Sequence, residues 1–307
     1  MKFKHKIAFI IPTRNRPDFL VKLLQSLQKQ TVGADQVIIV DGSDQPIESG
    51  IKQFLSSRVS YLRIFPPSLT KQRNEGIKVL NDNITLVGYL DDDLVLETDA
   101  VEAMLRFWEQ CSDEIGGTSF NITNNPIKKA NLFTKLFCIN NGKQGAILRS
   151  GYTTILSPVL KDTYTEWLCG GATVWRREVV EEFKYDEWFE GLGACDDADF
   201  SIVVAQKYKL IVQYAARVQH FPPPLNSKRC YSLGKIGVIS RHHFVRKHAQ
   251  LSIPLFFWAT LGEILGNTLY GVWKHRLCNI ILASGNIAGL TEVISISIKS
   301  TNKNFRK

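Results

Sequence analysis

Residues 86–96 read LVGYLDDDLVL, so an apolar segment leads directly into three acids, Asp91, Asp92 and Asp93. An apolar run of this length predicts a strand over 86–90, and the carboxyl end of such a strand opens onto the crevice where α/β sheets bind ligands. Carboxylates crowded there repel one another unless a cation or a donor compensates them. A divalent cation carrying a phosphate would do so, because Mg²⁺ and Mn²⁺ prefer oxygen ligands. The alternative is a solvated acidic turn.

The composition is that of an ordinary globular protein. The chain has 307 residues, of which 44% are hydrophobic and 22% charged, enough for one large domain or for a domain with an extension. Its six cysteines form no C-x-x-C pair, so we expect reduced thiols and a cytoplasmic protein. The basic start at 1–6 precedes only a short apolar run before Pro12, which is too short for a signal peptide.

The first half of the chain alternates strand-like and helix-like segments, which predicts a mostly parallel sheet flanked by helices. We expect strands at 6–11, 36–40, 61–64 and 86–90, and helices at 17–30, 70–80 and 100–108. Residues 115–165 carry little pattern and are expected to be loops with short strands. Farther on we expect a strand at 166–175, helices at 176–183 and 198–208, and a strand at 210–218. The prolines at 222–224 predict a domain boundary, hence one domain over 1–224 and an extension over 225–307.

Six motifs follow one another along residues 6–222. They are the loop at 10–17 (IIPTRNRP), the turn at 40–44 (VDGSD), Arg73 with Asn74 and Gly76, the three acids, Gly170 with Gly171, and the acids at 196–199 (DDAD). In this order and spacing the sequence resembles glycosyltransferase family 2. The resemblance implies a GT-A fold, which is Rossmann-like, a nucleotide-sugar donor, and sugar transfer with inversion at the anomeric carbon.

The resemblance also assigns residues to a metal. The three acids correspond to the D-x-D motif of the family, in which Asp91 and Asp93 would ligate Mg²⁺ or Mn²⁺ and Asp92 would stand beside the donor. His220 resembles a histidine that completes the metal site in some members. The metal would neutralise the charge that develops on the departing nucleoside diphosphate.

Further donor contacts are implied in three segments. They are Pro12, Thr13 and Arg14 after the first strand, Asp41 after the second, and Lys71 and Arg73 near the start of a helix. The alternatives are a hairpin turn for Asp41 and a solvated helical face for Lys71.

Asp197 is the candidate catalytic base, because 196–199 resembles the E-D-x-D pattern of the family and inversion needs a carboxylate to take the acceptor proton. Asp196 stands where Glu is frequent, and we expect it to contact the acceptor. Trp167, Gly170 and Gly171 would line the acceptor side, where glycine lets the backbone approach a sugar. The alternatives are helix capping for the two acids and core packing for Trp167.

The last part of the chain is basic. Residues 225–307 carry twelve Lys and Arg against Glu263 and Glu292, within a formal net charge of +9 for the whole chain. Residues 251–273 repeat apolar side chains at spacings of three and four, which predicts an amphipathic helix. The charge-free stretches 249–262 and 277–291 fall short of the ~20 residues of a membrane span. The pattern suits an anionic membrane surface, or helices packed on the catalytic domain or on a second copy in a homo-oligomer. Large aliphatic surface between the charges argues against nucleic acid.

We therefore predict a metal-dependent, inverting hexosyl- or deoxyhexosyltransferase that uses a UDP- or dTDP-sugar. Its acceptor would be a glycan or lipid-linked saccharide in cell-surface polysaccharide synthesis, at the cytoplasmic face of a membrane. One alternative is a sugar-nucleotide nucleotidylyltransferase, which is disfavoured because the loop at 12–16 has no glycine. The other is a non-catalytic glycan- or membrane-binding protein of the same fold.

Overall fold

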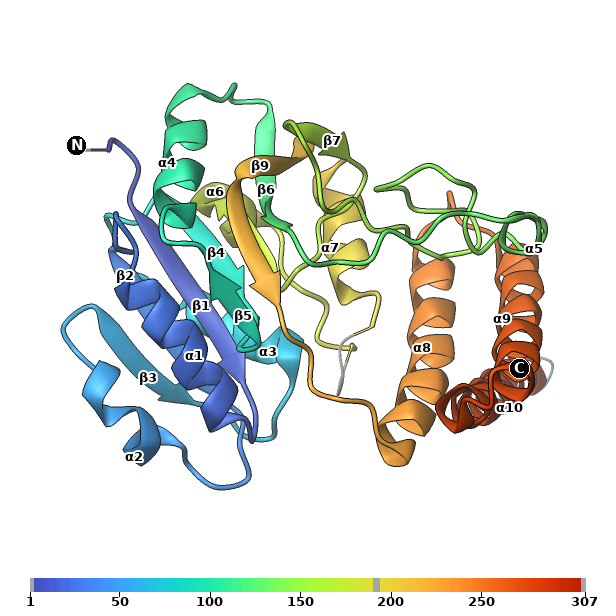
Figure 1. Cartoon of the computed structure of the whole chain (residues 1–307). Coiled ribbons are helices and arrows are strands. Elements are labelled where there is room, and N and C mark those ends of the chain that lie inside the picture. Colours follow the sequence, from blue (N-terminus) through green and yellow to red (C-terminus); the bar gives the residue numbers. More distant parts are fainter. Residues whose placement is uncertain (1–2, 190–193, 305–307) are drawn as a thin grey trace. The chain divides into compact units, whose positions relative to one another are not determined.

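Parallel pairing brings the carboxyl ends of β1 (Ile7–Thr13), β2 (Gln36–Asp41) and β4 (Leu86–Leu90) to one edge of a sheet. The computed structural model describes residues 3–189 and 194–304, with side chains as far as residue 296 (Figure 1). All three strands are buried along their whole length. Burial on both faces explains why their sequences are continuously apolar instead of alternating.

The remaining strands continue this sheet. They are β3 (Val59–Arg63), β5 (Leu94–Leu96), β6 (Ile115–Ile122), β7 (Thr163–Thr165), β8 (Ala172–Arg176) and β9 (Lys209–His220). The described residues form a nine-stranded sheet in the order β3-β2-β1-β4-β8-β6-β9-β5, with β7 paired to β9. The predicted parallel arrangement is correct for the first four strands, and β8 then runs antiparallel to both β4 and β6.

Helices cover both faces of the sheet. One face packs against α1 (Pro17–Gln28), α2 (Glu48–Ile51), the 3-10 turn η1 (Lys52–Phe54) and α4 (Ala100–Gln110). The other packs against α3 (Leu69–Ile77), α6 (Arg177–Glu182) and α7 (Asp196–Val204). These layers confirm the predicted α/β class.

The strand β6 was not expected at its full length. Residues 115–122 form the fully buried β6, in a region where the sequence predicts loops with short strands. Two glycines weaken the strand signal in the sequence, because glycine has a low strand propensity. The packing requires both of them, since a Cβ at Gly116 would crowd Tyr208 and a Cβ at Gly117 would overlap the Trp175 ring. The strand expected at 166–175 is also wrong in part, because it begins only at Ala172.

The chain divides into two compact units. The sheet unit comprises Met1–Ile127 and Ile155–Pro223, and the helical unit comprises Lys128–Thr154 and Pro224–Lys307. The helical unit contains α5 (Leu132–Leu136), α8 (Ser227–Lys247), α9 (Ile253–Trp273) and α10 (Leu277–Asn304). It therefore takes in a segment, 128–154, that the sequence-based division assigned to the first domain.

Glycines bring α8 and α10 into close contact. A Cβ at Gly234 of α8 would overlap the Leu282 carbonyl, and a Cβ at Gly285 of α10 would overlap the Tyr231 carbonyl. A disulfide between Cys230 and Cys278 joins the same helices. The expectation of reduced thiols is therefore wrong for these two residues, which lie far apart in sequence. Among the described residues, Cys111, Cys138, Cys169 and Cys195 are not in disulfides.

Among the described residues, the segment Leu277–Ile296 of α10 is long and apolar enough to cross a membrane by length and composition. The charge-free stretch 277–291 is too short for a membrane span, whereas the longer segment includes Glu292. One such helix is weak grounds for a span, because a core helix of a soluble protein meets the same criterion.

We expect Gly117→Val to lower the free energy of unfolding by about 1–3 kcal/mol, although valine has the higher strand propensity. The new side chain would collide with the Trp175 ring. Gly33→Ala is the matched control, because a Cβ at Gly33 meets nothing within 4 Å. Urea unfolding of both variants makes the comparison, and a Gly117→Val protein as stable as wild type would contradict the packing argument.

Candidate active site

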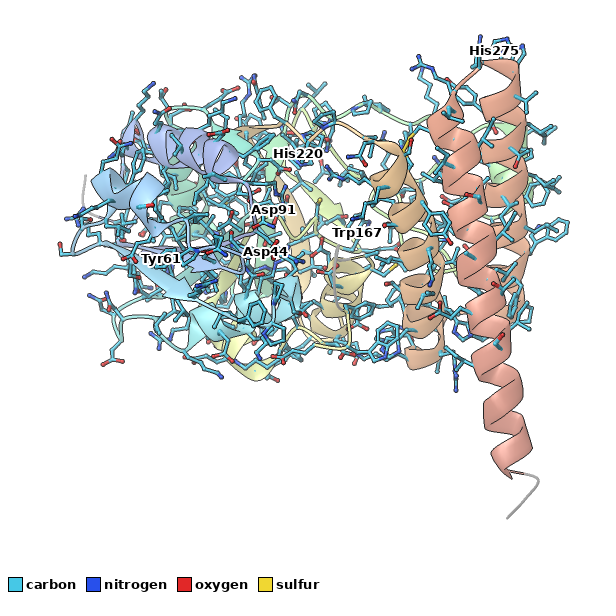
Figure 2. The ribbon with its side chains drawn as sticks, turned by 90° about the horizontal axis from the view of Figure 1, so that it is seen from below. Asp44, Tyr61, Asp91, Trp167, His220 and His275 are labelled. Carbon is cyan, nitrogen blue, oxygen red and sulfur yellow. A yellow bond between two sulfur atoms is a disulfide. The ribbon has the colours of Figure 1, made fainter. Side chains whose placement is uncertain are left out.

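The three acids that follow β4 lie at the carboxyl edge of the parallel strands, and Figure 2 labels Asp91 and His220 there. Asp92 is fully buried. The Thr13 hydroxyl at the end of β1 donates to Asp92 Oδ2 at 2.7 Å, and Arg16 Nη1 lies 3.2 Å from Asp92 Oδ1. Burial raises the pKa of Asp92 to about 7, against the opposing effects of Arg16 and Thr13. Asp92 thus holds the loop that follows β1 beside the three acids at the carboxyl end of β4, which we call the acid edge.

Asp93 is held by two basic side chains. Arg16 Nη1 lies 3.3 Å from its Oδ2, and His220 Nε2 lies 3.1 Å from its Oδ1. Burial works to raise the pKa of Asp93, but the hydrogen bond and charge of His220 and the charge of Arg16 outweigh it, so the pKa lies below its ordinary value. The same hydrogen bond raises the pKa of His220.

The backbone of His220 is fixed by Asn124. The His220 amide donates to Asn124 Oδ1 at 2.9 Å, and Asn124 Nδ2 donates to the His220 carbonyl at 2.8 Å. These two hydrogen bonds hold the end of β9 beside the acids, where the His220 imidazole contacts Asp93.

Arg73 of α3 is 1% exposed and joins three carboxylates. Its Nη1 lies 2.7 Å from Asp197 Oδ1 and 3.0 Å from Asp196 Oδ2. Its Nη2 lies 3.5 Å from Asp91 Oδ1. The guanidinium therefore connects the acid edge of β4 to the first turn of α7, and the expected contact to the donor stays a prediction.

Two aromatic rings complete the surroundings of the guanidinium. Arg73 Cζ lies 4.8 Å from the centre of the Tyr185 ring and 5.8 Å from that of Tyr89. Tyr185 in turn stacks on Phe200 of α7 at 4.4 Å. Cation–π contact adds to the ion pairs that hold a buried guanidinium in place.

Gly170 and Gly171 provide space for two of these carboxylates. A Cβ at Gly170 would overlap the Asp197 carboxylate, and a Cβ at Gly171 would overlap that of Asp91. The Asp91 amide also donates to the Gly171 carbonyl at 2.8 Å. The glycines predicted for the acceptor side are thus required by the acids themselves.

Of the three acids, Asp91 has the most exposed side chain, at 37%. Its pKa is raised by desolvation and, against the charge of Arg73, by the neighbouring Asp93 and Asp197. A divalent cation would relieve this repulsion, and the carboxylates of Asp91 and Asp93 suit Mg²⁺ or Mn²⁺ in donor chemistry. Within the described residues no group of three or more His, Cys, Asp or Glu is placed to hold a metal ion. Metal binding at Asp93 would have to replace the Arg16 or His220 contact.

The other residues predicted for the donor lie around the ends of β1 and β2. Asp41 is fully buried and accepts hydrogen bonds from the Tyr61 hydroxyl at 2.5 Å and the Ser43 amide at 2.8 Å, so it orders the turn that follows β2. Arg14 pairs with Asp44 at 3.2 Å, and both side chains are exposed. Pro12 is buried within β1, and Lys71 is half-buried in the first turn of α3.

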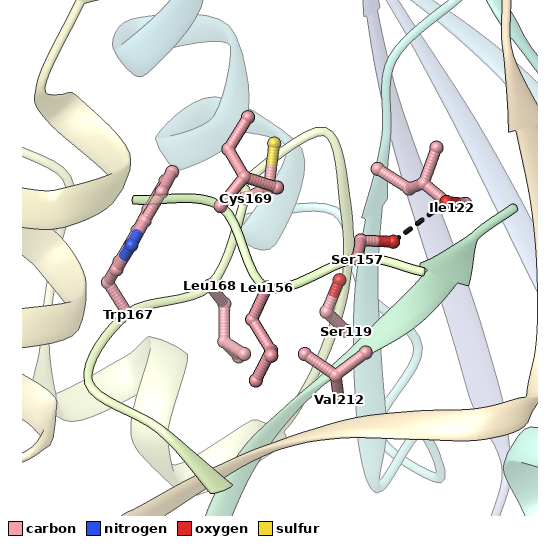
Figure 3. A pocket seen from close by; sticks show the side chains of 9 residues that line it. Ser119, Ile122, Leu156, Ser157, Trp167, Leu168, Cys169 and Val212 are labelled. Carbon is pink, nitrogen blue, oxygen red and sulfur yellow. Dashed lines mark hydrogen bonds between the residues drawn. The ribbon is translucent and has the colours of Figure 1, made fainter. Parts of the chain in front are cut away.

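Trp167 lines a small cavity together with Leu168 and Cys169 (Figure 3). The cavity measures about 10 Å³, which is at most the space of one water molecule, so a sugar cannot enter it. A larger hollow of about 330 Å³ borders Asp93 and is lined by Phe19, Lys22, Leu94, Val95, Gln219 and Phe221. Its volume is within the range of small-ligand sites.

Sequence reasoning missed several residues of this site. Arg16, which pairs with two of the acids, stands two positions from the predicted Arg14, and nothing in the sequence distinguishes the two arginines. Gln72 is buried and its Nε2 donates to the carbonyls of Thr13 and Val40, at 3.0 and 2.6 Å, which joins the ends of β1 and β2. Asn124 lies in the segment that was expected to lack pattern, so no signal marked it.

The sheet, its helices and the acid edge define a class of α/β enzyme whose ligands bind at the carboxyl ends of parallel strands. The model of the glycosyl transferase family 2 matches residues 8–182, more than half of the chain. The chain belongs to this family, and its architecture is that of a GT-A glycosyltransferase with additional C-terminal helices. A comparison with curated proteins found no significant match.

We expect Arg73→Met to lower the free energy of unfolding by about 3–5 kcal/mol at pH 8, because three carboxylates would lose their buried cation. Without that cation the folded-state pKa of Asp91 and Asp196 rises further above its ordinary value. The folded variant then binds more protons than the unfolded chain, so part of the loss is regained as the pH falls toward 5. Thermal unfolding at both pH values measures this.

The control is Arg106→Met, which breaks the exposed pair with Glu102 and should cost less than about 1 kcal/mol. Equal effects of the two substitutions, or an Arg73→Met loss that does not shrink on acidification, would contradict the role assigned to Arg73.

Proposed function

We propose that the chain transfers a hexosyl or deoxyhexosyl group from a UDP- or dTDP-sugar to a hydroxyl of a glycan or lipid-linked saccharide, with inversion at the anomeric carbon. The observation that carries this proposal is that the Arg73 guanidinium contacts both Asp91, at the acid edge, and Asp197, at the start of α7. A donor at the acid edge and an acceptor beside Asp197 would then meet. The process we propose is cell-surface polysaccharide synthesis, at the cytoplasmic face of a membrane.

Asp197 is the proposed general base. Its Oδ1 is held by Arg73, and 22% of its side chain is exposed. In the proposed step Oδ2 takes the proton of the acceptor hydroxyl while that oxygen bonds to the anomeric carbon, and the bond from this carbon to the diphosphate oxygen breaks. Asp196 is almost fully buried, and desolvation together with the charge of Asp197 raises its pKa despite Arg73, so we assign it to positioning.

Asp91 and Asp93, with His220, are the proposed ligands of Mg²⁺ or Mn²⁺. When bound, the metal would neutralise negative charge on the diphosphate leaving group. Arg16 already brings positive charge to Asp93, and its guanidinium would turn toward the diphosphate once the acid is engaged by the metal. The turn ordered by Asp41, together with Pro12, Thr13 and Arg14, would border the nucleoside, with Lys71 and Arg73 as the nearby cations.

We expect calorimetry to show binding of UDP or dTDP, but not GDP, that strengthens at least tenfold with Mn²⁺. Asp93→Ala should abolish the Mn²⁺ dependence, whereas Asp113→Ala, an exposed acid paired with Arg176, should leave it unchanged. Nucleotide binding indifferent to Mn²⁺ would contradict the metal role. Absence of any nucleotide binding would favour the non-catalytic alternative.

We expect Asp197→Asn to lower the rate of sugar transfer by about 10²- to 10⁴-fold, the usual contribution of a general base. The amide can still accept a hydrogen bond from Arg73, so nucleotide affinity and the unfolding temperature should change little. Transfer is measured with a panel of nucleotide sugars and saccharide acceptors, and Asp113→Asn serves as the charge-matched control. A fully active Asp197→Asn protein would exclude Asp197 as the base.

A further inference from the structure

The helical unit carries a stripe of large apolar side chains on its outer surface. On α9, Leu261, Leu265 and Leu269 are 44%, 41% and 63% exposed. The stripe continues to Val272 and Trp273 at the end of the helix, which are 62% and 71% exposed. A water-soluble helix normally turns such a stripe toward the core.

Inside the unit, α9 has polar side chains beside the buried Phe256 and Ala259. Thr260 is fully buried. The Glu263 carboxylate accepts hydrogen bonds from the Tyr152 hydroxyl at 2.5 Å, from Arg241 Nη1 at 3.2 Å and from Asn286 Nδ2 at 3.4 Å. The Arg241 guanidinium also lies 3.6 Å from the centre of the Tyr152 ring. The charge of Glu263 is thereby satisfied within the unit, with 23% of its side chain exposed.

The helix α10 shows the same polarity. Its outer surface has large aliphatic side chains at Leu277, Ile280, Ile287 and Ile294. Its inner side has Asn286 and small residues, and Gly285 and Gly289 lie so close to α8 that a Cβ would overlap the carbonyls of Tyr231 and Lys235. Small residues and hydrogen-bonding side chains between helices, with aliphatic side chains outside, are typical of helices that pack in lipid.

Aromatic and basic side chains gather where α9 meets α10. Lys274, His275 and Arg276 form the exposed turn, and Figure 2 labels His275 there. The Lys274 ammonium lies 3.8 Å from the centre of the Trp273 ring, and Tyr270 is exposed one turn earlier. Trp and Tyr beside Lys and Arg are the side chains preferred at a membrane–water interface, and such cations are attracted to anionic headgroups.

We infer that the outer surface of α9 and α10 lies in the interface of a membrane that contains anionic lipids. This lipid face consists of Leu261, Leu265, Leu269, Val272, Trp273, Leu277, Ile280 and Ile287. The large apolar side chains that these helices expose would enter the hydrocarbon, and the basic turn at 274–276 would meet the headgroups. Neither this surface nor its lipid partner follows from the donor site, so membrane binding here does not depend on the proposed reaction.

Charge favours lipid over a second copy of the chain. Residues 225–307 carry twelve Lys and Arg against two acids, so pairing two helical units through this face would bring like charges together. An anionic bilayer offers both the apolar layer and the opposite charge.

Flotation of the full chain with vesicles tests the inference. We expect binding to phosphatidylcholine vesicles with 30–40% phosphatidylglycerol, roughly, and much weaker binding to phosphatidylcholine alone. Lipids brominated near the headgroup end of the acyl chain should quench the fluorescence of Trp273, and the quenching should fall in Trp273→Phe. The combined variant Leu261→Ser, Leu265→Ser, Leu269→Ser should bind anionic vesicles at least tenfold more weakly.

The matched control is Leu160→Ser, which removes an almost fully exposed leucine from the sheet unit and should leave vesicle binding unchanged. Unchanged thermal unfolding of the leucine variant would show that the loss is not due to misfolding. Absence of vesicle binding, or binding that survives all three leucine substitutions, would overturn the inference. So would a stable dimer without vesicle binding that dissociates in the leucine variant, because the face would then belong to a second copy.

Discussion

The arrangement of the candidate active site depends on one buried guanidinium. Arg73 cannot be desolvated without anions beside it, so the chain must bring Asp91, Asp196 and Asp197 together around it as it folds. This requirement links the end of β4, the start of α7 and α3, which lie far apart in sequence. It also explains why the neighbouring loop has two glycines, since larger residues would displace the carboxylates that neutralise Arg73.

The sequence predicted those parts of the fold that rest on local pattern. The strand at 86–90 has the predicted bounds, and α1 begins at Pro17 as expected, because an apolar run and a proline-started leucine repeat need no distant information. The strand β6 could not be predicted, because the reason for its glycines is the Trp175 and Tyr208 rings from other elements. Motif order predicted the acids as site residues, but it could not tell whether Arg14 or Arg16 pairs with Asp92 and Asp93, because the path of a loop decides this.

In the helical unit, the sequence predicted a helix but not which of its sides would be exposed. The spacing of leucines in α9 predicted an amphipathic helix, and the helix is present at Ile253–Trp273. Spacing cannot tell which side of a helix meets other protein atoms. That choice is made by partners from elsewhere in the chain, such as Tyr152 and Arg241, which satisfy Glu263 and leave the leucines outside.

The helical unit is assembled from two separate stretches, 128–154 and 224–307. Ala146, Leu148 and Tyr152 of the first stretch form a small core with Ala259 of the second. Proteolysis or a stop codon near residue 224 would therefore not release an intact catalytic half. It would leave an inserted loop with an uncovered apolar surface, prone to self-association. Isolating the sheet unit requires replacing residues 128–154 by a short polar linker at the same time.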